Sequence, residues 1–183
     1  MNKLPSDFNM QKYGLNVRLV DEDDAAFILK LRTNERLARH IHSTEDDLNR
    51  QVQWIRDYKI REIEGREYYF MYSKGNNPIG VSRVSNIFEY FGLGGSWLCS
   101  PDNDPLDSMK TPFIAHDICF EVIGLDYIVF DVRKANKHVW KFHESAGAIR
   151  LGESEIDYYY YLYNKNYFAK RSHFIKLLTN NKV

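Results

Sequence analysis

The sequence has little that would link it covalently or electrostatically to a large partner. Its two cysteines, Cys99 and Cys119, both fall in apolar runs, which favours reduced thiols in a core over a disulfide. The 25 basic residues balance 25 acidic ones, so no overall field attracts nucleic acid or a membrane surface. A phosphate-bearing ligand would therefore have to be held by local groups.

Long apolar runs are also missing. No stretch approaches the roughly 18 apolar residues that a membrane span requires, and no signal peptide is recognisable. We therefore expect a cytoplasmic protein without a membrane partner. Internal repeats, low-complexity runs and linkers are absent too, so the 183 residues predict one domain over 15–183, preceded by a flexible, irregular segment over 1–14.

Aromatic residues, in contrast, are abundant. They make up 15% of the chain and include 13 tyrosines. Such a composition suits amphipathic pockets, and a tyrosine-rich core or interface explains it equally well.

Periodicity and capping signals predict a mixed α/β order. Strands are expected over 15–20, 67–73, 79–87, 90–99, 127–132, from 148 onward and over 156–163. Helices are expected over 25–34, from Ser43 to Gly65 with Ser43 and Asp46 at capping-box spacing, and over 112–123 with Pro112 in the first turn. A further helix runs from an Asn136 cap to Gly147, a basic helix or tail covers 167–178, and 104–111 is expected to be a polar loop.

The stretch from Tyr127 to Leu151 carries a family resemblance. Asn136 opens its helix, Phe142-His143 lie near the end, and Ala146-Gly147-Ala148 close it. This pattern resembles the last acetyl-CoA-contacting unit of the GNAT N-acetyltransferases, although His143 stands where the family usually has Tyr and Ala148 where it has Phe. The predicted element order is also that of the GNAT fold. The resemblance implies an α/β fold with a central mixed seven-stranded sheet, splayed fourth and fifth strands and about four flanking helices.

Within this group the chain is similar to acetyltransferases of the pseudaminic acid pathway, which acetylate a UDP-linked 4-amino sugar. The likeness rests on L-R-T-N-E at 31–35, H-S-T at 42–44, Q-W-I at 53–55, I-G-V-S-R-V-S at 79–85 and F-E-V-I-G-L-D-Y-I-V-F-D-V at 120–132. It implies transfer of acetyl from acetyl-CoA to the amine of a nucleotide-linked amino sugar in a ternary complex. Ribosomal-protein acetyltransferases share several of these motifs, so acetylation of a protein N-terminus is an alternative.

The resemblance also places the acetyl-CoA site. Gly92, Gly94 and Gly95 soften the strand over 90–99, whose counterpart in the family pairs with the pantetheine arm. The expected contacts are Leu98, Cys99, Ser100, Ser108, Met109, Lys110, Thr111, Asn136, Val139 and Phe142. The phosphate loop departs from the family's Gln/Arg-x-x-Gly-x-Gly/Ala pattern, because Asp107-Ser108 stand where glycines are expected. A catalytically silent ligand-binding domain on the same scaffold is therefore a third hypothesis.

Direct acetyl transfer needs a base, an oxyanion donor and a proton for the leaving thiolate. His143 replaces the family's usual Tyr acid, and an ordinary pKa of about 6.5 would suit it; a structural histidine is the alternative. The oxyanion donor is expected to be a main-chain N–H near Leu98 or Cys99. Glu89 could act as base through a water, or be a surface residue. Asp131 lies within a strand that is expected to be buried, which predicts a structural pair with Arg133 or a histidine.

Arginine and aromatic side chains define the expected substrate side. Arginine suits a nucleotide diphosphate and aromatic rings suit a base or a sugar face. The candidates are Arg32, Asn34, His40, His42, Trp54, Arg83 and Tyr90, with ordinary surface or core positions as the alternative. His40 and His42 alone make a poor metal site, and no metal is expected. We expect an amino sugar nucleotide as the small-molecule partner and no nucleic acid; a homodimer is left open.

Overall fold

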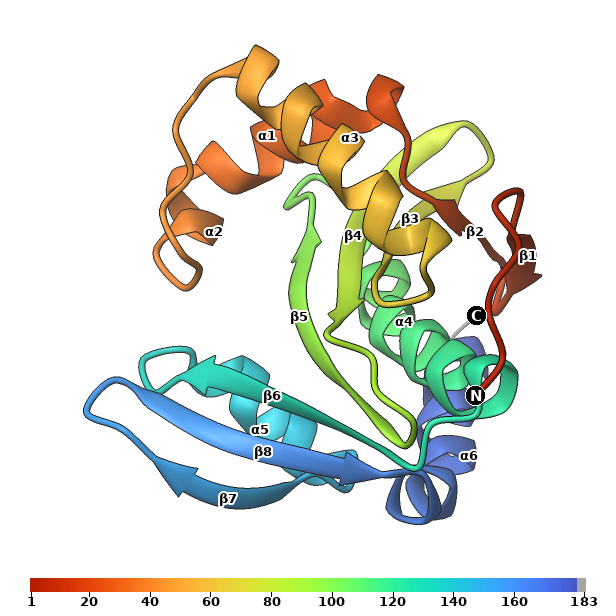
Figure 1. Ribbon diagram of the computed structural model, residues 1–183. Helices are drawn as coiled ribbons and strands as arrows, with labels where there is room; N and C mark the ends of the chain where they lie inside the picture. Colours follow the sequence, from red (N-terminus) through yellow and green to blue (C-terminus); the bar gives the residue numbers. More distant parts are fainter. Residues whose placement is uncertain (181–183) are drawn as a thin grey trace.

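The computed structural model describes residues 1–180, with one mixed sheet of eight strands and six α-helices (Figure 1). The strands are β1 (Asn9–Lys12), β2 (Leu15–Leu19), β3 (Tyr68–Lys74), β4 (Asn77–Ser85), β5 (Phe91–Cys99), β6 (Tyr127–Arg133), β7 (Ile149–Glu153) and β8 (Asp157–Tyr163). The helices are α1 (Ala25–Thr33), α2 (Glu35–Ala38), α3 (Leu48–Ile63), α4 (Pro105–Asp117), α5 (Lys137–Ser145) and α6 (Asn164–Asn180). None of these helices is long and apolar enough to cross a membrane.

The sheet divides into two arms. Its strand order is β1-β2-β3-β4-β5-β6-β8-β7, and every neighbouring pair is antiparallel except β5 and β6. These two strands pair in parallel over only three residues, which end at Leu93 and Val129. Beyond that point they diverge, and Figure 1 shows β1–β5 and β6–β8 as the two sides of a V. The expected splay between the family's fourth and fifth strands is thus confirmed.

The N-terminal segment differs from the expectation of an irregular tail. Residues 9–12 form β1, which pairs with β2 through a tight turn at Tyr13 and Gly14, both with positive φ. Leu4 is buried in the core. The seven expected strands follow in their expected order, so β1 is the one addition to the predicted sheet.

The region between α1 and α3 differs from the capping signals in two ways. Asn34 caps the short helix α2, which was not predicted, through hydrogen bonds from the amides of Arg36 and Leu37. Helix α3 begins at Leu48, where Asp47 and not Ser43 or Asp46 accepts from the amide of Arg50 at 3.1 Å. The helix starts here because the Asp47 carboxylate, directly before the first helical residue, accepts from a free amide of the first turn.

Helix α4 begins seven residues before its predicted start. Asp104 caps it and Pro105 occupies the first position, where its missing N–H costs nothing. Pro112 lies inside the helix and cannot donate to the carbonyl of Ser108. The hydroxyl of Thr111 donates to that carbonyl at 2.8 Å instead. A side chain thus supplies the lost hydrogen bond, and the expected loop at 104–111 is helical apart from its cap.

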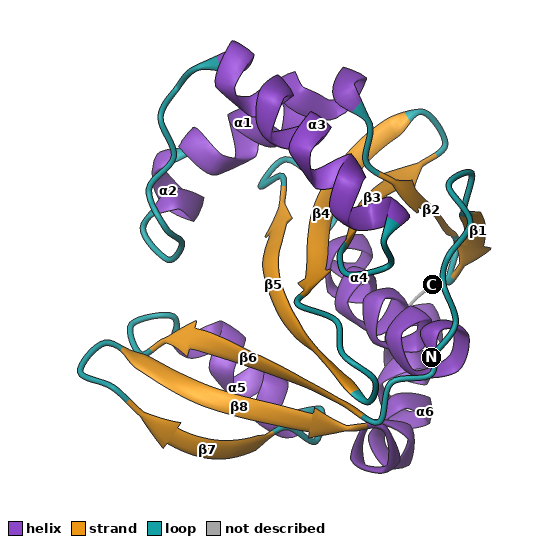
Figure 2. Cartoon of the chain, in the orientation of Figure 1, coloured by secondary structure: helices purple, strands orange, loops and turns teal. Residues whose placement is uncertain are grey.

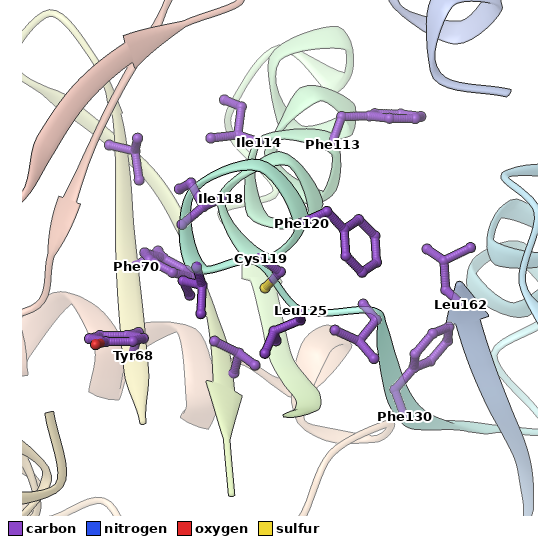
Figure 3. Packing of buried hydrophobic residues seen from close by; sticks show 14 of the residues in the cluster. Tyr68, Phe70, Phe113, Ile114, Ile118, Cys119, Phe120, Leu125, Phe130 and Leu162 are labelled. Carbon is purple, nitrogen blue, oxygen red and sulfur yellow. The ribbon is translucent and has the colours of Figure 1, made fainter. Parts of the chain in front are cut away.

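Helices cover both faces of the arm formed by β2–β5 (Figure 2). Helices α1 and α3 pack on one face of the β2–β5 arm, around Ile28, Ile55 and Leu98. Helix α4 and the π-helical turn that continues it to Ile123 cover the other face. Their side chains fill the space between β3 and the β6–β8 arm, as Figure 3 shows for Ile118 and Phe120. The core on this face therefore joins the two arms of the sheet.

Candidate active site

A cavity of about 1030 Å³ lies where β5 and β6 diverge. Its walls come from α1, α2 and α3 on one side and from α4, α5 and β6 on the other, with β4 and β5 between them. The cavity therefore passes through the sheet and connects the two faces. Such a passage allows two ligands to approach one another from opposite sides.

The edge of β5 that faces β6 has no strand partner beyond Leu93. An extra residue bulges β5 here, because Arg83 pairs with Gly95 while Val81 pairs with Leu98, and Ser96 takes a φ of +49°. A Cβ built on Gly95 would meet no atom within 4 Å. The gap between the diverging ends of β5 and β6, called the wedge below, thus combines unpaired main-chain groups with open space. Such a gap suits an extended ligand that carries amide groups.

The end of the cavity next to α4 and α5 is aromatic. The His143 ring lies 4.5 Å from that of Phe130 and 5.8 Å from that of Trp97. Burial, together with repulsion from His116, lowers the pKa of His143 to about 3. His143 is therefore a neutral imidazole near pH 7 and not the protonated acid that its ordinary pKa suggested. It can still donate a hydrogen bond from one ring N–H.

The residues expected at the phosphate loop have other partners. Asp107 is buried, and its oxygens accept hydrogen bonds from Lys74 at 2.6 Å and Lys110 at 2.7 Å. The Thr111 hydroxyl accepts from Trp97 Nε1 at 2.9 Å. The aspartate that stands where a glycine was expected is thus neutralised by two lysines.

The first turn of α4 offers few free amides. Pro105 has no N–H, the amide of Leu106 donates to the Asp104 side chain at 2.9 Å, and that of Ser108 donates to the Asp104 carbonyl. This arrangement differs from the bare glycine-rich turn that binds phosphates in many proteins. The wedge fits a thioester arm, whereas α4 lacks a main-chain cradle for a pyrophosphate.

The remaining predicted cofactor contacts fall into two groups. Leu98, Cys99, Ser108, Asn136 and Val139 line the cavity. Ser100, Met109, Lys110, Thr111 and Phe142 do not line it. Asn136 holds the expected N-cap position of α5, but its side chain makes no capping hydrogen bond. Gly147 follows α5 with a φ of +103°, as predicted.

The opposite end of the cavity is rich in arginine. Arg32, Arg36 and Arg50 line it from the α1–α3 side, Arg83 lines the cavity from β4, and Arg133 lines it from the end of β6. Arg32 donates to the Thr44 hydroxyl at 2.7 Å. Among residues 1–180, neither Arg32 nor Arg36 has an ion-pair partner. Two guanidinium groups are therefore available to an anionic ligand.

Trp54 is both a packing residue and part of the cavity wall. Its ring stacks on Tyr58 with 5.9 Å between centroids, and the Arg83 guanidinium lies 5.4 Å from its centre. Arg83 is held by the buried carboxylate of Glu67 at 3.1 Å. These contacts fix an aromatic surface and a positive charge side by side.

Three other predicted residues are not brought to the cavity. Asn34 caps α2, whereas Glu89 and Tyr90 are exposed in the turn before β5. His40 and His42 do line the cavity, as do Arg32, Trp54 and Arg83. Within residues 1–180, no cluster of three or more His, Cys, Asp or Glu side chains could hold a metal ion.

The position of Asp131 differs from the one expected from the sequence. It was expected to be buried and paired, but it is exposed on β6 and lines the cavity, while Arg133 pairs with Asp157 at 3.0 Å. Glu45 and Asp47, which also line the cavity, both pair with Arg50. Asp131 is thus the lining carboxylate without an ion-pair partner among the described residues. Its alternation with Ile128, Phe130 and Val132 could have revealed this, since those residues face the core.

Comparison with solved structures supports the interpretation of the wedge. The chain is similar to FdhC, described as a nucleotide-linked sugar GNAT, with a TM-score of 0.83 and 31% identity over 94% of this chain and 99% of that one. It is also similar to the ribosomal-protein-S5-alanine acetyltransferase from Vibrio fischeri, with a TM-score of 0.75 and 18% identity over 88% and 99%. A spermidine N-acetyltransferase from Vibrio cholerae in complex with CoA and spermine gives 0.71 and 17% over 86% and 99%. No model of a known family and no curated protein matches the sequence.

The splayed sheet and its cavity thus match the fold of the GNAT acetyltransferases. With 31% identity to FdhC over 94% of its length, the chain belongs to the GNAT superfamily. The two other structures, at 17–18% identity, support the fold alone.

Proposed function

We propose that the protein transfers an acetyl group from acetyl-CoA to the primary amine of a nucleotide-linked amino sugar, by direct attack in a ternary complex. The observation that carries the proposal is the cavity through the sheet, with arginines at one end and neutral, aromatic-packed histidines at the other. The likeness to a nucleotide-linked sugar GNAT agrees with this choice.

The arginine-rich end favours an acceptor that carries a diphosphate. Among residues 1–180, Arg32 and Arg36 have no ion-pair partner, and Arg83 lies beside the ring of Trp54. Guanidinium groups bind phosphate oxygens in two-pronged geometry, and an indole face stacks on a planar base or covers a sugar. A polyamine would meet like charges here, which argues against spermidine.

Each residue of the site then has a role in the reaction that its position allows. Asp131 binds the acceptor's ammonium group and accepts one of its protons as the amine attacks the thioester carbonyl. Main-chain N–H groups of β5 near the bulge donate to the oxygen that gains negative charge. As the carbon–sulfur bond breaks, the second proton of the attacking nitrogen passes to the leaving sulfur, to which the neutral His143 ring donates a hydrogen bond. Acetyl-CoA supplies the activated thioester.

An acceptor panel tests the proposal. Purified protein with acetyl-CoA is assayed for CoA release on UDP- and dTDP-linked amino sugars, on spermidine and on a peptide with the ribosomal S5 N-terminus. We expect kcat/KM for a nucleotide-linked amino sugar to exceed that for the free amino sugar at least ~100-fold, because the diphosphate contacts are lost from the latter. Turnover of the peptide or spermidine alone would contradict the acceptor assignment.

A thermal-shift measurement separates this enzyme from a silent domain on the same scaffold. Acetyl-CoA at 100 times its Kd should stabilise the protein by about 2.7 kcal/mol. The self-capped start of α4 predicts weaker binding than a glycine-rich loop would give. No shift at millimolar acetyl-CoA would favour the silent domain.

A further inference from the structure

A second cavity lies beside the one between β5 and β6, which is called the first cavity below. The second cavity has a volume of about 440 Å³. Its walls come from Arg39 and Ile41 after α2, from residues 133–135 at the end of β6, and from Glu155 and Ile156 in the turn before β8. Figure 1 shows α2 and this end of the β6–β8 arm on opposite sides of the wide end of the V. The second cavity thus lies between the two arms.

The two cavities are continuous with one another. Ile41 and Arg133 line both of them. Asp131 and Arg133 are two residues apart on β6, so their side chains leave the same face of the strand and their Cα atoms are roughly 7 Å apart. Since β6 runs away from β5 in this direction, a ligand that reaches Asp131 and extends along β6 passes Arg133 and enters the second cavity.

The free charges of the second cavity balance. Arg133 and Lys134 are each held by a carboxylate at 3.0 Å. Among residues 1–180, neither Arg39 nor Glu155 has an ion-pair partner. One cation and one anion are therefore free here, whereas two guanidinium groups are free at the arginine-rich end of the first cavity. A diphosphate suits the first cavity, and a group without net charge suits the second.

The lining of the second cavity matches the parts of a nucleoside. Ile41 and Ile156 offer apolar surface, and the Ile156 side chain is 56% exposed. A free guanidinium such as that of Arg39 stacks on a planar ring. A free carboxylate such as that of Glu155 accepts a hydrogen bond from a sugar hydroxyl. The volume lies near the lower end of the roughly 300–1,000 Å³ of ligand pockets, so it holds one part of a sugar nucleotide and not the whole.

We propose that the second cavity binds the nucleoside of the nucleotide-linked acceptor. The amine then lies at Asp131, the diphosphate lies beside the free arginines of the first cavity, and Trp54 covers the sugar and not the base. This assignment rests on the proposed function. The adenine nucleotide of acetyl-CoA shares the same chemistry, but Arg39 and Ile41 follow directly on the helices that carry the free arginines, which favours the acceptor.

Photolabelling tests where the base binds without requiring turnover. The full chain is labelled with 5-azido-UDP, and the labelled peptides are identified by mass spectrometry. We expect label within residues 39–41, 133–135 or 155–156, and we expect excess UDP to suppress it while adenosine 3′,5′-bisphosphate does not. Label at Trp54 that UDP suppresses would overturn this inference and leave the proposed function intact. Suppression by the bisphosphate alone would assign the second cavity to acetyl-CoA. Absence of UDP-sensitive label, with no UDP binding in calorimetry, would overturn the inference together with the acceptor class.

Ala135→Trp tests the second cavity by filling it. Ala135 is exposed, so the variant should fold, which thermal unfolding verifies. We expect the Kd for UDP and the KM for the nucleotide-linked amino sugar to rise at least ~10-fold, because the indole takes the place of the nucleoside. KM for the amino sugar 1-phosphate, which has no nucleoside, should stay within ~2-fold of the wild type.

Ala169→Trp is the matched control for this variant. Ala169 is exposed on α6 and lines neither cavity, so its substitution should change none of these constants. An unchanged Kd for UDP in Ala135→Trp, or equal increases in KM for both acceptors, would overturn the nucleoside site.

Discussion

At the scale of single residues, Asp131 has a proposed catalytic role and contributes little to the stability of the fold. Its side chain is exposed and has no partner among the described residues, so its loss should change stability by less than about 0.5 kcal/mol. It lies two residues beyond the last β5–β6 pair, on the strand that forms one wall of the cavity. An unpaired carboxylate opposite several arginines matches an acceptor that combines an ammonium group with phosphates.

We expect Asp131→Asn to lower kcat/KM at least ~100-fold, because a general base typically contributes 10²–10⁴ in rate. Steady-state kinetics on the best acceptor, with chemical denaturation in parallel, measures both effects. Glu89→Gln is the matched control, since Glu89 is exposed and outside the cavity. A large loss in Glu89→Gln with little change in Asp131→Asn would return the base to the residue first suggested by the sequence.

Several residues that the sequence singled out by their side-chain type lie in the cavity wall, namely Arg32, His42, Trp54, Arg83 and His143. Their roles there stay a prediction. Sequence reasoning failed where a property depends on neighbours far along the chain. The low pKa of His143 arises from burial and from His116, and neither could be seen in the local pattern.

At the scale of elements, the wedge depends on a strand that cannot pair along both edges. The glycines that soften β5 lie at its bulge, which follows directly after Gly95. The start of α4 was predicted wrongly because Asp104-Pro105 was considered part of a loop, although it is a cap followed by a favoured first position. Helix α2 was missed because four residues give no periodicity.

Gly95→Val tests the wedge at this scale. A Cβ at Gly95 meets nothing within 4 Å, and its φ is not positive, so the variant should fold with a stability equal to or up to about 1 kcal/mol above that of the wild type. Its side chain would project into the cavity, and we expect KM for the acceptor to rise at least ~10-fold, since the substrate and the valine would compete for space.

Gly152→Val is the matched control for this prediction. Gly152 also has no neighbour within 4 Å of a built Cβ, but it lies on the outer strand β7, away from the cavity. Its kinetics should remain unchanged. If Gly95→Val kept wild-type KM values for both substrates, the wedge would not be where the substrates meet.

At the scale of the whole molecule, one buried carboxylate connects three distant parts of the chain. Asp117, at the end of α4, accepts hydrogen bonds from Tyr13 at 2.5 Å and Tyr167 at 2.8 Å. Lys12 of β1 and Arg171 of α6 each pair with it at 2.7 Å. The N-terminal strand and the C-terminal helix are therefore both held to the helix that forms one wall of the active site.

This connection predicts a specific dependence of stability on pH. Burial alone would raise the pKa of Asp117, but hydrogen bonds from Lys12, Tyr13, Arg171 and Tyr167 outweigh it and lower the pKa. An unfolded aspartate titrates near 3.9, so the unfolded chain binds more protons in acid than the folded one. The stabilisation is thus complete above about pH 5 and is lost as the pH falls through the folded-state pKa.

We expect Asp117→Asn to lower the free energy of unfolding by about 2 kcal/mol at pH 7, since Lys12 and Arg171 keep Glu121 as a partner. The difference from the wild type should shrink as the pH falls below about 4, where the wild-type carboxylate becomes protonated as well. Urea unfolding at several pH values measures both trends, with the exposed Asp102→Asn as control. A difference that stays constant down to pH 2.5 would mean that shape, and not charge, makes Asp117 the residue that holds β1 and α6 to the active-site helix.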